Sequence, residues 1–113
     1  MNERKVDSFI AEKIMKRKVY KYKNIDTCEA IDEEGNIVIV GKEFSPSTKI
    51  QDAWMAVEKL PYDIKVTKYK DLEPKYQAHV FIPDNVQMLF ADTAPMAICL
   101  AALKAVGVEV NKR

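Results

Sequence analysis

The sequence predicts a single α+β domain spanning residues 1–113, with the element order α-β-β-α-β-β-β-α. The segment 94–107 predicts a helix, since 11 of its 14 residues are apolar and Lys104 carries its only charge. A helix that is apolar nearly all round is normally buried. The segment 63–91 predicts three strands with short connections, which favours sequential neighbours in an antiparallel sheet. We therefore expect helices packed on this sheet.

The N-terminal segment 3–15 predicts an amphipathic helix. Its large apolar residues recur at spacings of three and four, which places them on one helical face. These residues are Val6, Phe9, Ile10 and Ile14.

A β-hairpin is predicted next. The run 37–40 is β-branched throughout, as in a strand that is buried on both faces. The polar run 32–36 contains Gly35 and predicts a turn between 30–31 and 37–40. The segment 19–22 also has strand composition, and the sequence leaves open whether it adds a third strand.

The segment 48–60 predicts a second helix. Thr48 and Gln51 fit a capping box, in which each side chain satisfies the other residue's backbone amide. Pro61 ends the helix, because the residue before a proline disfavours the helical conformation. Trp54 is the only tryptophan and lies at the centre of the apolar face, so we expect it in the core. The other residues of this face are Ile50, Ala53, Val57 and Leu60.

Three strands are predicted between the second helix and the last one. Apolar and polar residues alternate along them, as in strands with one buried face. Turn-forming residues around Pro74 and Pro83 separate them. The strands are predicted at 63–69, 76–82 and 86–91.

The last helix has a marked start and a marked end. Asp92 or Thr93 can cap its first amide groups, and Pro95 suits its first turn. Gly107 can adopt the left-handed conformation that ends a helix. The helix is too short to cross a bilayer.

Composition excludes several classes of protein. Eighteen Lys or Arg residues and 17 Asp or Glu residues give a formal net charge of +1, which favours no particular partner. No apolar signal segment or membrane-spanning run is found, so no membrane association is predicted. Cys28 and Cys99 lack further ligands at zinc spacing. We therefore predict a reduced, cytoplasmic protein without a metal or cofactor.

A basic segment at 13–23 is the main candidate for binding an anionic partner. Its six cations are interleaved with Tyr20 and Tyr22, a pattern that favours phosphate backbones and stacked bases. The alternative is a solvated helix end and a lysine-protected edge strand, neutralised by the acidic residues that follow. The cations are Lys13, Lys16, Arg17, Lys18, Lys21 and Lys23. The acidic residues are Asp26, Glu29, Asp32, Glu33 and Glu34.

The sequence predicts no catalytic residue. Asp92 and Thr93 could take part in acid–base chemistry, but helix capping explains both. His79 is the only histidine, and its alternating strand places it at the rim or outside. Cys99 lies on the apolar helix, where it is expected to fill space in the core. No Ser-His-Asp or Cys-His set can be assembled, so an enzyme is not expected.

Three blocks of sequence resemble a known family. They are Phe9-Ile10-Ala11-Glu12-Lys13-Ile14-Met15, then Phe44-Ser45-Pro46-Ser47-Thr48 with Asp52-Ala53-Trp54-Met55-Ala56-Val57-Glu58-Lys59-Leu60, then Ala91-Asp92-Thr93-Ala94-Pro95-Met96-Ala97-Ile98-Cys99-Leu100-Ala101-Ala102-Leu103. In this order they resemble the phage ABA-sandwich domain of small phage and prophage proteins. Where that family often has Gly-Trp after the first block, this chain has Lys16-Arg17. The resemblance implies a phage or prophage origin, a bacterial host cell and an α/β/α sandwich, and it implies no activity.

The apolar helix at 94–107 leads to two hypotheses of function. If the rest of the chain leaves part of this helix bare, a homodimer or a phage or host protein partner would cover it. Complete burial within one chain is the alternative. The leading hypothesis is a non-enzymatic accessory protein that acts through protein contacts. The second is nucleic-acid binding through the basic segment at 13–23.

Overall fold

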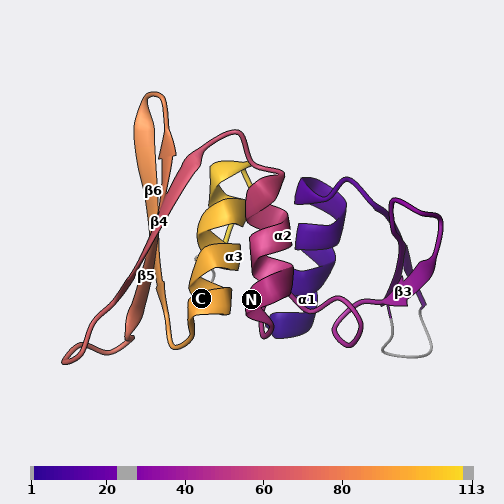
Figure 1. Ribbon diagram of the computed structural model, residues 1–113, viewed down its shortest axis with the longest axis horizontal. Coiled ribbons are helices and arrows are strands. Elements are labelled where there is room, and N and C mark those ends of the chain that lie inside the picture. Colours follow the sequence, from indigo (N-terminus) through magenta and orange to yellow (C-terminus); the bar gives the residue numbers. More distant parts are fainter. Residues whose placement is uncertain (1, 23–27, 111–113) are drawn as a thin grey trace.

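Three layers of secondary structure build the protein, whose computed structural model describes residues 2–22 and 28–110. One layer of helices lies between two three-stranded antiparallel sheets (Figure 1). The predicted α+β class and sandwich are confirmed, with the layers in the order sheet, helices, sheet, and the undecided segment forms a strand, β1. The elements are α1 (Glu3–Phe9), η1 (Ile10–Ile14), β1 (Lys18–Lys21), β2 (Cys28–Ile31), β3 (Ile37–Ile39), α2 (Ile50–Glu58), β4 (Asp63–Lys68), β5 (Tyr76–Ile82), β6 (Asn85–Ala91) and α3 (Ala94–Ala105).

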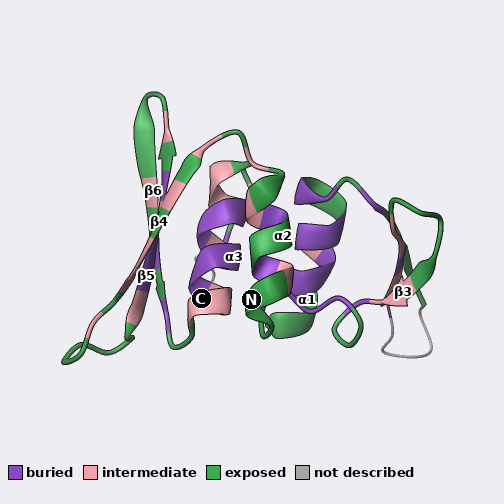
Figure 2. Ribbon diagram, viewed as in Figure 1, coloured by how far each residue is buried: buried purple, intermediate pink, exposed green. Residues whose placement is uncertain are grey.

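The helix α3 lies at the centre of the molecule, against β5 and β6 on one side and against α1, η1 and α2 on the other (Figure 2). Its start is the predicted one, since the Thr93 hydroxyl accepts a hydrogen bond from the Met96 amide at 3.4 Å. Its end is also as predicted, with Gly107 at φ +91°. The chain itself covers the helix, because six of its residues are completely buried. They are Ala97, Ile98, Cys99, Ala101, Ala102 and Leu103.

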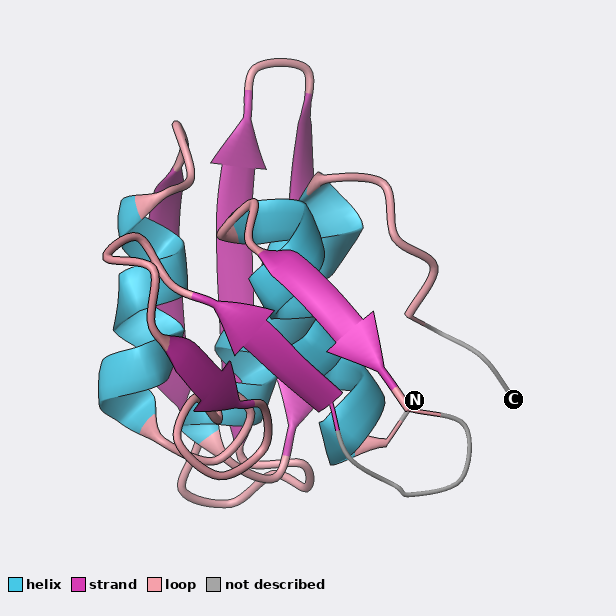
Figure 3. Ribbon diagram, turned by 90° about the vertical axis from the view of Figure 1, so that its right-hand side faces the viewer, coloured by secondary structure: helices cyan, strands magenta, loops and turns pink. Residues whose placement is uncertain are grey.

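The larger sheet has the order β4-β5-β6 and lies behind the helices in the view of Figure 3. Its register places Ile64 opposite Val80 and Ala78 opposite Leu89. These residues face the helices and belong to the core. Because side chains alternate along a strand, their neighbours in sequence point to the opposite, outer face of the sheet.

The smaller sheet has the order β1-β2-β3 and contains the predicted hairpin. The turn is closed by Asp32, whose carboxylate accepts hydrogen bonds from the amides of Glu34 and Asn36. The prediction that the run 37–40 is buried on both faces was wrong, since Ile37 is 63% exposed. The reason is that β3 is a short edge strand in an outer layer, so helices cover one of its faces only.

The N-terminal helix departs from a regular α-helix after Phe9. The hydrogen bond from the Met15 amide to the Ile10 carbonyl, at 2.9 Å, closes a π-helical turn. Lys16 follows at φ +59° and turns the chain into β1. The sequence predicted one continuous helix over 3–15, and its wider last turn was missed.

Two predictions about α2 were wrong. Trp54 is 43% exposed, because α2 packs through the small residues Ala53 and Ala56, which are buried and let the helices approach closely. The expected capping box is absent, since the N-cap residue Lys49 makes no side-chain cap. The Thr48 hydroxyl instead lies 2.6 Å from that of Ser45.

Candidate functional site

The predicted basic segment begins in η1 and continues along β1, which is an edge strand of the smaller sheet. Four of its lysines are exposed side chains. Tyr20 and Tyr22 beside them are also exposed, and the Tyr22 hydroxyl donates a 2.7 Å hydrogen bond to Glu29, which raises the pKa of Tyr22. Lys23 and Asp26 lie outside the described residues. The four exposed lysines are Lys13, Lys16, Lys18 and Lys21.

Arg17 differs from these lysines because its side chain is buried. Its guanidinium donates two hydrogen bonds to the Glu33 carboxylate, at 2.9 and 3.1 Å, and stacks 4.7 Å above the Phe44 ring. The hydrogen bonds hold the pKa of Glu33 below its usual range. The charge of Arg17 is therefore already paired inside the chain, and this pair ties the hairpin to the helix layer.

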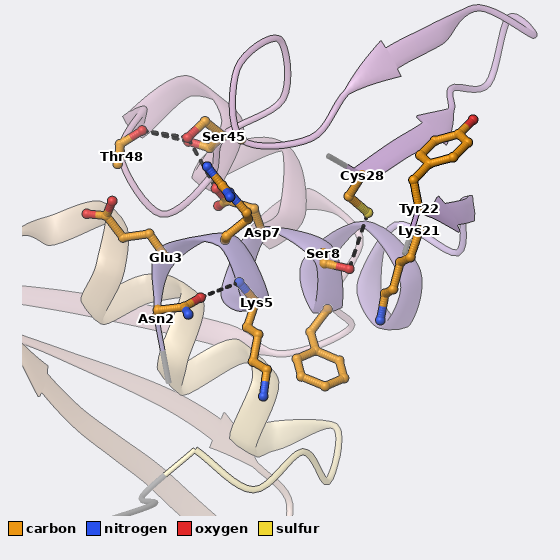
Figure 4. A pocket seen from close by; sticks show the side chains of 13 residues that line it. Asn2, Glu3, Lys5, Asp7, Ser8, Lys21, Tyr22, Cys28, Ser45 and Thr48 are labelled. Carbon is orange, nitrogen blue, oxygen red and sulfur yellow. Dashed lines mark hydrogen bonds between the residues drawn. The ribbon is translucent and has the colours of Figure 1, made fainter. Parts of the chain in front are cut away.

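A polar cavity of about 640 Å³ opens between α1 and the smaller sheet (Figure 4). Residues of the first helix and of the basic segment line it together, among them Lys5 and Lys21. Ser8 and Cys28 both line the cavity, with 3.6 Å between the hydroxyl oxygen and the sulfur. Cys28 is buried on β2.

Asp7 is the buried carboxylate of this cavity. One of its oxygens accepts a hydrogen bond from the Ser47 amide at 2.8 Å, and the other accepts from the Ser45 hydroxyl at 3.3 Å. Burial raises the pKa of Asp7, and the hydrogen bonds from Ser47 and Ser45 oppose this rise. The carboxylate therefore holds the loop before α2 against α1, which is a structural role.

The residues considered for catalysis do not converge. Thr93 caps α3, and with Asp92 it lines a second cavity of about 450 Å³. His79 lines neither of these two cavities; its ring stacks on Phe81 on the larger sheet at 5.9 Å. Burial raises the pKa of the Cys99 thiol far above its usual range, which keeps it protonated. Among the described residues, no three potential metal ligands are grouped.

The outer face of the β4–β6 sheet carries an apolar surface that the sequence reasoning missed. Four large side chains point away from the helices and remain 40–52% exposed. Tyr69 extends the surface, since its ring lies 6.2 Å from that of Phe90 and its hydroxyl donates to Gln77 at 2.6 Å. This outer apolar face consists of Phe81, Val86, Met88 and Phe90.

Comparison with protein families gives a match to the phage ABA sandwich domain over residues 8–103. The chain belongs to the phage ABA sandwich domain family. A crystal structure of a phage protein from Bacillus cereus ATCC 14579 is similar to it, with 43% sequence identity and a TM-score of 0.74. The similarity covers 94% of this chain and 93% of that one. No curated protein matches.

The phage ABA sandwich match includes both the basic segment and the outer apolar face, whereas Asp7 lies just before it. The resemblance seen in the sequence is therefore confirmed. In this member of the family, no helix of the described ranges is both long and apolar enough to cross a membrane.

Proposed function

We propose that this phage ABA sandwich protein is a non-enzymatic accessory protein that binds another phage or host protein through its outer apolar face. The observation that carries the proposal is the exposure of four large apolar side chains on one sheet face. Grouped apolar side chains on the surface of a soluble protein mark contact sites more often than scattered ones do. Aromatic residues and Met are also enriched where proteins meet.

The position of the contact surface differs from the one that the sequence suggested. The apolar helix α3 needs no partner, since the larger sheet and the other helices bury it. The larger sheet has helices on one face only, and its other face carries Phe81 and Phe90 into solvent. A partner covering this sheet would bury aromatic surface without disturbing the core.

A photo-crosslinking amino acid at Phe81 tests the proposal in bacteria that carry the phage genes. We expect it to capture one discrete phage or host protein, because Phe81 lies within the outer apolar face. The same amino acid at Leu72, which is 51% exposed in the loop between β4 and β5, is the matched control and should capture none.

The captured protein, once purified, should bind the Phe90→Ser variant at least about fivefold more weakly than the unchanged chain, since truncating a central contact costs more than about 1 kcal/mol. The Leu72→Ser variant should bind normally. The proposal fails if Phe81 captures no protein beyond the Leu72 control, or if Phe90→Ser leaves the affinity unchanged.

Nucleic-acid binding is the second candidate, and the four exposed lysines beside Tyr20 and Tyr22 favour it. We expect little lysine-dependent binding, because Arg17 is paired with Glu33 and Tyr22 with Glu29. A gel shift at low salt with DNA and RNA checks this, with all four lysines changed to Ala as the comparison. Binding that is lost in this variant, and that weakens steeply with salt, would favour the second candidate.

A further inference from the structure

The strand β6 is an unusual sheet edge. Natural edge strands are commonly short or carry charges, which prevents pairing with other chains. Among the edges described here, β3 has three residues, β1 carries Lys18 and Lys21, and β4 carries Lys65 and Lys68. β6 has seven residues and contains no charged residue, Gly or Pro.

The register shows which backbone groups β6 offers. The Tyr69 amide donates to the Lys75 carbonyl at 2.6 Å, so odd-numbered residues of β5 bond to β4 and even-numbered ones bond to β6. The β5–β6 register then directs the backbone groups of residues 86, 88 and 90 outward. The Val86 amide is accordingly bonded to the Asn85 side chain, at 2.8 Å.

The outward amides and carbonyls of Met88 and Phe90 have no hydrogen-bond partner within residues 2–22 and 28–110. Their side chains are 52% and 44% exposed, so the same two residues present both free backbone groups and apolar surface. An edge of this kind is suited to receiving another strand.

We propose that β6 pairs with β6 of a second copy of this chain, antiparallel and about a two-fold axis at Met88. The Met88 amide then donates to the carbonyl of the partner's Met88, and the Phe90 amide donates to the carbonyl of the partner's Val86. The two-fold axis repeats both bonds in the other direction, from the partner's amides to the carbonyls of this chain. The two sheets become one sheet of six strands. This inference rests on the proposed function, since it gives the assembly in which the outer apolar face acts.

Three observations favour a second copy as the occupant. Self-pairing places Met88 opposite the partner's Met88 and brings two copies of the same strand together, so charges of one sign on β6 would repel each other, and β6 has no charge. The pairing puts Val86 beside the partner's Phe90 on the same face, which is a favourable apolar contact across strands. The opposite edge, β4, is protected by its lysines, so assembly closes at two copies.

Sedimentation velocity over a range of concentrations tests the pairing. We expect a dimer, and we expect Met88→Lys to weaken it at least tenfold, because two lysines would meet at the two-fold axis. Leu72→Lys makes a similar change at an equally exposed position and should leave the dimer intact. A monomer at all concentrations, or a dimer indifferent to Met88→Lys, would overturn the inference.

A Met88→Cys variant gives a second and positive readout. Residues directly opposite in a hydrogen-bonded antiparallel pair have Cα atoms about 5.5 Å apart, which a disulfide can span. Mild oxidation should therefore link Met88→Cys to itself and leave Leu72→Cys unlinked. The two proposals can fail separately. A monomer in which the Phe81 position still captures another protein would overturn the pairing alone. A dimer that captures no other protein would overturn the proposed function alone.

Discussion

Replacing Leu103 with Ala is expected to lower the free energy of unfolding by about 2–5 kcal/mol. Leu103 is completely buried on α3, where the larger sheet and the other helices meet. The truncation removes contacts in a layer that cannot collapse onto the gap without moving a whole helix. A domain of this size is stable by only about 5–15 kcal/mol, so the loss is a large fraction of the total.

Urea unfolding followed by circular dichroism measures this loss. Leu72→Ala removes the same atoms from a side chain that is 51% exposed, and it should change stability by less than about 0.5 kcal/mol. Equal effects of the two substitutions would show that α3 does not form the core as described.

Replacing Asp7 with Ala is expected to cost about 1–3 kcal/mol, because the buried Ser47 amide loses its acceptor. Asp7→Asn keeps an acceptor at the same place and removes the ionisable group, so it separates the hydrogen bond from the charge. If both variants were as stable as the unchanged chain, the loop before α2 would not depend on this carboxylate.

The same pair of variants gives a test by pH. The folded-state pKa of Asp7 lies above its usual 3.8, so between these two values the folded state binds more protons than the unfolded state. The contribution of Asp7 to stability therefore decreases as the pH rises through this window. Asp7→Asn should gain stability relative to the unchanged chain over the same window. The pKa of Glu33 is lowered, so its contribution to stability has the opposite pH dependence. This contribution cancels in the comparison because Glu33 is present in both chains.

Sequence patterns predicted the larger sheet and α3 well because both depend on short-range signals. Alternation and short turns determine β4, β5 and β6, and the cap at Thr93 and the stop at Gly107 are local features. The errors around α2 have a longer-range cause. Thr48 and Ser45 bond to each other next to Asp7, which lies about 40 residues away, and no local rule anticipates that partner.

The candidate sites were harder to predict for the same reason. The basic segment was visible in the sequence, but the inward position of Arg17 depends on Glu33 in the hairpin turn and on Phe44 beyond it. The outer apolar face could have been suspected from β6, which is uncharged and apolar on both sides. Its exposure depends on the placing of the smaller sheet, which lies beyond the helices and leaves no layer to cover the larger one.

The central position of α3 has a consequence for synthesis on the ribosome. Each sheet is made of strands that follow one another in the chain, so each can begin to pair as it emerges. Among the elements of this domain, α3 is translated last, and the larger sheet and the other helices pack against it. Until α3 leaves the ribosome, the inward face of the larger sheet lacks the helix that covers β5 and β6, and exposed apolar surface of this kind favours aggregation of a nascent chain. Packing of the core is thus completed only after α3 has emerged.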